Sequence, residues 1–151
     1  MTLTGGQLIY LIGSLRNPQV PIVAAQLRAA GYDVFDDWYA AGEKADDAWR
    51  DYEKARGHRL KEALEGKAAR HVFEFDKTWL RQADVVVLMT PAGKSGHLEL
   101  GWALGQGKPG FILLDNDPDR YDVMYAFATG VAETMDQLLT MIRRDHMQRK
   151  S

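Results

Sequence analysis

Cysteine is absent from this chain, and the absence removes several kinds of chemistry from consideration. Disulfide bonds, zinc sites built on thiolates and a cysteine nucleophile all require this residue. Long apolar runs are also missing, since Leu8–Ile12 and Val85–Met89 are the longest and both are far too short to cross a bilayer. No basic leader with a cleavage site precedes them. We therefore expect a cytoplasmic protein that does not enter a membrane.

The chain also lacks a strong excess of either charge. Its formal net charge is -2, whereas proteins that bind long nucleic acids carry a marked basic excess. Of its 151 residues, 46% are hydrophobic and 26% are charged, which is typical of one globular domain with a real core. We expect a single domain over residues 1–151 and a small-molecule partner instead of a nucleic acid polymer.

Buried strands alternate with helical segments along the sequence. Apolar runs predict strands over residues 8–12, 32–35, 84–89 and 111–114. Helical patterns are expected from Asn17, as the N-cap before Pro18, to Gly31; across 45–83 with breaks at Gly57 and Gly66; and over 95–107 and 136–144. This order predicts an α/β fold with a doubly wound, flavodoxin-like or Rossmann-like parallel sheet of about five strands.

Two unusual loops follow the first and third predicted strands. In such sheets, ligands bind beyond the carboxyl ends of the strands at the switch point. The loop Gly13-Ser14-Leu15-Arg16 and the segment from Pro91 to Glu99 would therefore face each other across one crevice. We expect the functional site there.

Glu99 is the strongest candidate for chemistry in this crevice. We expect it in the first turn of its helix, where free amides and the helix dipole favour an ionised carboxylate. The alternative is an ordinary acidic residue at a helix start. Gly93, Gly96 and Gly101 would let the backbone approach a ligand closely, and the buried hydroxyl of Tyr10 needs a partner, for which Glu99 is suitable.

Four further residues have both a functional and an ordinary interpretation. Arg16 can grip a phosphate or carboxylate, or it is a surface arginine. Asp76 either points into the core, where burial would raise its pKa, or lies on the surface of an amphipathic helix. Asp37 and Trp38 belong to a group of acids interleaved with aromatic residues, which favours solvated acids beside core or base-stacking rings.

Other site classes fit the sequence poorly. The stretch Gly93-Lys94-Ser95 fails the phosphate-loop pattern because the first glycine would fall at Leu88. No spacing of acids or histidines matches a metal site, and no nucleophile elbow is present. We expect no metal and no cofactor.

Taken in order, several segments resemble the nucleoside 2-deoxyribosyltransferases and the related deoxynucleoside 5′-monophosphate N-glycosidases. The segments that carry the resemblance are Ile9 to Arg16, Phe75-Asp76, Ala83 to Val87, Leu98 to Ala103 with Gly107-Lys108, and Asp122 to Tyr125. The resemblance implies that Glu99 is a nucleophile that forms a glycosyl ester, that Tyr10 orients it, and that Asp76 assists at the leaving base or the sugar. It also implies a homo-oligomer in which Asp122 and Met124 complete a neighbour's pocket.

Two positions depart from that family's pattern. The transferases have an acidic residue near the position of Gly93, and the monophosphate-cleaving branch has a phosphate-holding serine where Asp122 stands. Gly13 to Arg16 resemble the segment that cradles a 5′-phosphate, whereas the Asp122 carboxylate would repel phosphate and accept a hydrogen bond from a free 5′-hydroxyl. The expected substrate contacts are Gly13, Ser14, Leu15, Arg16, Asp37, Trp38, Gly93, Ser95, Gly96, Asp122 and Met124.

The sequence thus favours an enzyme that cleaves the N-glycosidic bond of a nucleoside or its 5′-monophosphate and passes the sugar to another base or to water. The alternative is a non-catalytic nucleotide-binding or sensor domain on the same fold.

Overall fold

The computed structural model describes residues 6–150 and is built on a five-stranded sheet with the order β2-β1-β3-β4-β5. All neighbouring strands are parallel, and Tyr10 of β1 lies opposite Val86 of β3. The strands are β1 (Leu8–Ile12), β2 (Asp33–Phe35), β3 (Val85–Met89), β4 (Gly110–Leu113) and β5 (Gly130–Ala132). This strand order confirms the predicted doubly wound sheet.

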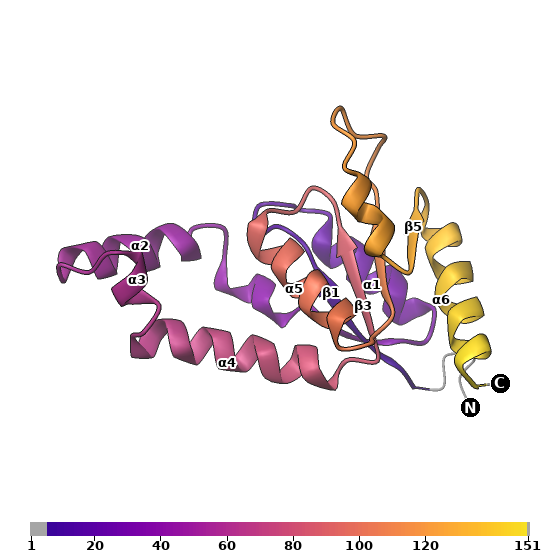
Figure 1. The fold of residues 1–151 in the computed structure, drawn as a ribbon, viewed down its shortest axis with the longest axis horizontal. Coiled ribbons are helices and arrows are strands. Elements are labelled where there is room, and N and C mark those ends of the chain that lie inside the picture. Colours follow the sequence, from indigo (N-terminus) through magenta and orange to yellow (C-terminus); the bar gives the residue numbers. More distant parts are fainter. Residues whose placement is uncertain (1–5, 151) are drawn as a thin grey trace.

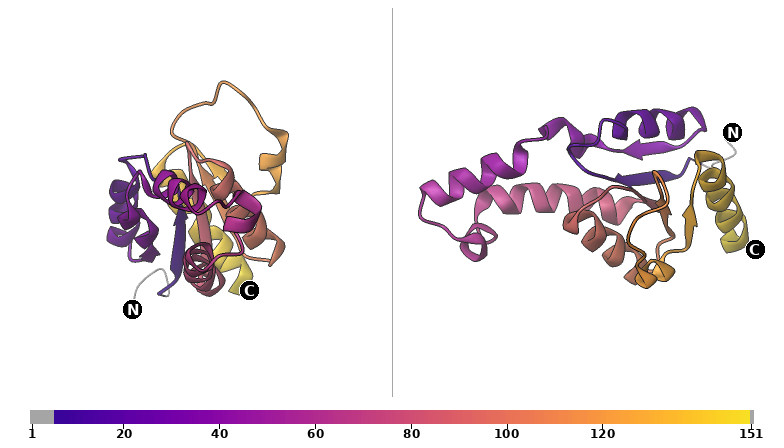
Figure 2. Two further views of the ribbon diagram at one scale, coloured as in Figure 1. Left: turned by 90° about the vertical axis from the view of Figure 1, so that its left-hand side faces the viewer. Right: turned by 90° about the horizontal axis from the view of Figure 1, so that it is seen from above.

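Helices cover both faces of the sheet (Figure 2). They are α1 (Val20–Ala29), α2 (Ala45–Ala55), α3 (Leu60–Ala63), α4 (Lys67–Gln82), α5 (Lys94–Gly105) and α6 (Met135–Lys150), with short 3₁₀ helices η1 (Asp37–Ala41) and η2 (Val123–Phe127). Among residues 6–150, none of these helices is both long and apolar enough to span a bilayer.

The central strands β1, β3 and β4 are buried on both sides, and alternate side chains enter two separate cores. Ile9 and Leu11 of β1 point into the core formed with α1 and α6. Tyr10 and Ile12 point into the opposite core, which includes Leu80 of α4 and Leu100 of α5. Because strand side chains alternate, the hydroxyl of Tyr10 lies on the side of the sheet that carries α5.

The helices α2, α3 and the first part of α4 form an arm that projects from the sheet, at the opposite end of the molecule from both termini (Figure 1). Few side chains of the arm are buried. One is the carboxylate of Glu53, which lies 2.9 Å from His58 Nδ1 and 3.5 Å from Arg56 Nη1. These two contacts compensate a buried acid and hold the turn between α2 and α3.

Three local features differ from the sequence predictions. The side chain of Asn17 accepts a hydrogen bond from the backbone of Gln19 at 2.9 Å, so it closes a turn and α1 begins only at Val20. The short strand β5 was not predicted, because only Ala132 within it is fully buried. The last helix continues to Lys150, well beyond the predicted end at residue 144.

Candidate active site

Tyr10 and Glu99 meet at the switch point of the sheet. The ring of Tyr10 is buried, and its hydroxyl donates a hydrogen bond of 2.5 Å to Oε2 of Glu99. This contact joins β1 to α5 across 89 positions of sequence. The predicted partnership of these two side chains is therefore confirmed.

Gly96 explains how α5 comes close enough for this contact. A Cβ atom at Gly96 would lie only 2.7 Å from Cγ2 of Ile12, which is closer than real Cβ contacts. The helix therefore packs directly onto the end of β1, and Glu99 reaches Tyr10 one turn later. Ile12 fills the space where a side chain at position 96 would lie, and the expected contact of Gly96 with a ligand stays a prediction.

The expected position of Glu99 also needs correction. Since α5 begins at Lys94, Glu99 lies in the second turn, and the first turn holds no acidic residue. Burial raises the pKa of the Glu99 carboxyl from an ordinary value of 4.5 to about 7, the hydrogen bond from Tyr10 lowers it, and the charge of Asp76 raises it. Glu99 is thus divided between its ionised and neutral forms near neutral pH.

Asp76 stands near this pair, on α4. It is half-buried, and burial raises the pKa of its carboxyl. Burial is the main cause of the raised pKa of both the Tyr10 hydroxyl and Glu99, and the charge of Asp76 raises both further, as a carboxylate close to that pair would. The structure therefore favours the inward orientation of Asp76 over the surface alternative.

Aromatic rings from β2 and α4 pack against Tyr10. The ring of Phe35 lies 5.1 Å from that of Tyr10 and stacks on Trp79 at 5.3 Å. Phe75 packs against Phe35 at 5.8 Å and remains 48% exposed. These rings fix Tyr10 and bring the α4 segment that carries Asp76 against the sheet.

The loop after β1 is less closely tied to Glu99. Arg16 is exposed, and its guanidinium lies 3.5 Å from Asp47 of α2. Ser14 accepts a hydrogen bond from the Arg16 amide at 3.1 Å, and Leu15 is half-buried. A Cβ atom at Gly13 would lie 3.0 Å from Val20, so this glycine allows close packing of the loop.

Trp38 and Asp37 lie on η1, just beyond β2. The indole Nε1 of Trp38 donates to the carbonyl of Leu11 at 2.8 Å, and the ring packs against both cores. Asp37 is exposed. Trp38 therefore connects η1 to the end of β1, whereas Asp37 remains available to solvent.

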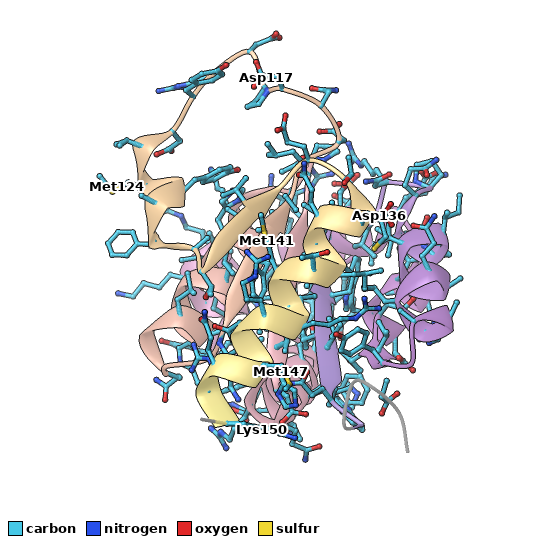
Figure 3. All side chains as sticks on the ribbon, turned by 90° about the vertical axis from the view of Figure 1, so that its right-hand side faces the viewer. Asp117, Met124, Asp136, Met141, Met147 and Lys150 are labelled. Atoms are coloured by element: carbon cyan, nitrogen blue, oxygen red, sulfur yellow. The ribbon has the colours of Figure 1, made fainter. Side chains whose placement is uncertain are left out.

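The start of α5 and the segment η2 hold the other predicted contacts. Gly93 and Ser95 are both exposed at the beginning of α5. Nothing lies within 4 Å of the position that a Cβ atom at Gly93 would take. Asp122 caps η2 by accepting a hydrogen bond from the amide of Met124 at 2.9 Å. Met124 is 61% exposed and points outward from the body of the protein (Figure 3).

Two features of this region were not predicted. A groove of about 760 Å³ lies between the turn after β3 and the segment from Asp115 to Tyr125. His97, which no sequence pattern singled out, bonds to Gly93 and Tyr125. No sequence spacing relates His97 to Tyr125, so only the fold reveals their contact. Within residues 6–150, no group of three or more histidine, aspartate or glutamate side chains is placed to hold a metal ion.

Comparison with known proteins bears on the fold. No protein-family model matches the sequence, and no curated protein matches it. Among solved structures, the chain is similar to the Clostridium botulinum CMP N-glycosidase BcmB, with a TM-score of 0.54 and 12% sequence identity. The match covers 89% of this chain and 96% of that one, and at this identity it shows a shared fold.

Proposed function

We propose that this protein cleaves the N-glycosidic bond of a nucleoside, a deoxynucleoside or a corresponding 5′-monophosphate, with Glu99 as the nucleophile. The observation that carries the proposal is the hydrogen bond between Tyr10 and Glu99 at the switch point, beside the carboxyl of Asp76. The fold shared with a CMP N-glycosidase supports the same class of reaction.

In the proposed first step, the ionised Glu99 carboxylate attacks the anomeric carbon and forms a glycosyl ester. The electron pair of the broken C–N bond leaves with the base. In this step Asp76 would carry a proton and donate it to the base, and burial raises the pKa of its carboxyl above the ordinary value. Tyr10 holds Oε2 of Glu99, so that the other oxygen is free to attack.

In the second step, water or another base attacks the same carbon and releases the Glu99 carboxylate. Asp76, now ionised, accepts the proton of the incoming group. Two displacements at one carbon retain the configuration of the sugar. A hydrolase and a transferase on this site differ only in the acceptor.

The contacts at the substrate's 5′ end belong to the same proposal. Arg16 would hold a phosphate by leaving its exposed ion pair with Asp47, a contact worth little in solvent. Asp122 favours a free hydroxyl instead. We propose that Asp122 and Met124 act in the site of a neighbouring copy within a homodimer or larger homo-oligomer, because Met124 points outward in its own chain.

The decisive experiment compares wild type with Glu99→Ala on a panel of nucleosides and 5′-monophosphates, with release of free base as the readout. We expect loss of nearly all activity in the variant. Glu74→Ala, at an exposed glutamate of α4, is the matched control and should remain active. Mass spectrometry of wild type with a slow substrate should detect a sugar ester on Glu99.

Two outcomes would contradict the proposal. Undiminished base release by Glu99→Ala would remove the nucleophile assignment. Tight binding of nucleotides without any turnover would instead support a non-catalytic sensor domain on this fold.

A further inference from the structure

His97 connects three segments around the start of α5. One ring nitrogen, Nδ1, lies 2.8 Å from the carbonyl oxygen of Gly93, and the other, Nε2, lies 2.9 Å from the hydroxyl of Tyr125. The two rings also stack, with their centroids 5.8 Å apart and 20° between their planes. One side chain thus binds the turn after β3, its own helix and η2.

The hydrogen-bond partners determine which nitrogen carries the proton. A carbonyl oxygen only accepts, so Nδ1 of His97 must be the protonated nitrogen that donates to Gly93. In the neutral ring, Nε2 then has a free lone pair, and the Tyr125 hydroxyl donates to it. The geometry therefore specifies the Nδ1–H tautomer.

Tyr125 is the anchor of η2. It is half-buried and packs against the core that contains Tyr10, whereas Val123, Met124 and Phe127 of the same helix are 76%, 61% and 75% exposed. Ala128, just beyond the end of η2, packs against the same core. Without Tyr125, this residue would provide the main contact between the η2 region and that core. The contact with His97 therefore sets where η2 stands relative to α5.

We propose that His97 and Tyr125 form a latch that positions η2, and with it Asp122 and Met124, for contact with the substrate. This role rests on the proposed function, in which these two residues complete a neighbouring copy's site. The latch itself touches no reacting atom, so both members are positioning residues. It acts on how tightly the substrate is held, and leaves the chemistry at Glu99 unchanged.

The latch is tested first by a measurement that does not depend on activity. In protein labelled with ¹⁵N-histidine, ring nitrogen shifts should identify His97 as the Nδ1–H tautomer. Tyr125→Phe removes the hydroxyl but keeps the ring, so the shift of Nε2 should change. Tyr121→Phe is the matched control, because its hydroxyl bonds to Asp117 in the same segment and not to α5.

Kinetics then test the positioning role. Loss of one hydrogen bond should raise KM about three- to tenfold in Tyr125→Phe, while kcat stays within about twofold of wild type. Tyr121→Phe should match wild type in both. The Nε2–H tautomer in wild type, an unchanged Nε2 shift in Tyr125→Phe, or a fall in kcat at constant KM would each overturn the latch. A wild type without turnover would contradict the proposed function, while the nitrogen shifts would still decide the latch.

Discussion

At the scale of single residues, the neighbours of the Glu99 carboxyl shift its pKa in opposite directions. Burial and the charge of Asp76 raise its pKa, whereas the hydrogen bond from Tyr10 lowers it, and the result is about 7. A nucleophile must be ionised, so the rate should rise with pH as Glu99 loses its proton. The two neighbours therefore have opposite effects on the acid limb of the pH profile.

Tyr10→Phe removes the hydrogen bond that favours the ionised form. The pKa of Glu99 should rise above about 7, so the acid limb should move to higher pH. A hydrogen bond to a charged group contributes about 1.5–3 kcal/mol, which corresponds to a fall of roughly tenfold or more in rate on the acid side. The measurement is kcat/KM for base release against pH; a limb that stays in place would show that Tyr10 does not tune Glu99.

Asp76→Asn should move the acid limb in the other direction. Removing the negative charge lowers the pKa of Glu99, so the limb should shift to lower pH. The maximum rate should nevertheless fall by about 10²–10⁴-fold, because the proton donor for the leaving base is lost. A pH series with one substrate measures both effects, and a variant with full activity would exclude Asp76 from proton transfer.

Sequence reasoning identified the Tyr10–Glu99 pair because a buried strand tyrosine needs a partner near the strand end. It misjudged the electrostatics of Glu99, because it did not anticipate the burial that raises the pKa of this carboxyl, and because the exact start of α5 decides whether a residue stands in the first or second turn. It also did not single out His97, whose partner Tyr125 is 28 positions away. Contacts of this kind arise from tertiary packing and leave no local pattern.

At the scale of elements, the approach of α5 to β1 determines whether the site forms. The helix lies against the strand because Gly96 has no side chain where Ile12 packs. Gly101, on the same helix, has nothing within 4 Å of the position a Cβ would take. These two glycines allow a matched comparison.

Gly96→Ala should destabilise the protein and weaken activity together. The added methyl would lie 2.7 Å from a buried Ile12, and overpacking of this kind costs about 1–3 kcal/mol. The helix would also move away from Tyr10. Gly101→Ala should instead be neutral or stabilise by up to about 1 kcal/mol through helix propensity. Urea denaturation and base release on both variants check this, and equal stability would contradict the packing argument.

At the scale of the whole molecule, sequence pattern predicted the alternation of strands and helices and a doubly wound parallel sheet, because central strands that are buried on both faces read as continuous apolar runs. It did not predict β5, whose three residues carry too little apolar pattern. The arm was recognised only as helices separated at Gly57 and Gly66. The arm projects because few of its side chains pack against the rest of the protein. The sequence does not reveal which segments lack such packing partners.

The buried acid should affect the stability of the entire fold. The folded pKa of Glu99, about 7, exceeds its ordinary value of 4.5, so its contribution is most favourable below pH 4.5 and is lost as pH rises through 7. Glu99→Gln does not titrate. Its free energy of unfolding should therefore exceed that of wild type at about pH 8.5 by on the order of 1–3 kcal/mol, and approach it at about pH 4. Urea denaturation at both values tests the sign.

The proposed sharing of sites between copies leads to a complementation test. Glu99→Gln lacks the nucleophile, and Asp122→Ala/Met124→Ala lacks the groups proposed to act in the neighbouring copy. In a mixed dimer, one site combines the intact Glu99 of one chain with the intact η2 of the other, while the second site carries both defects. If chains pair at random, half of the dimers are mixed and each has one working site, so co-refolding should restore roughly a quarter of wild-type activity. A mixture of Glu99→Gln with Glu99→Ala controls for refolding and should stay inactive. Activity no greater than the sum of the separate variants would mean that each chain builds its site alone.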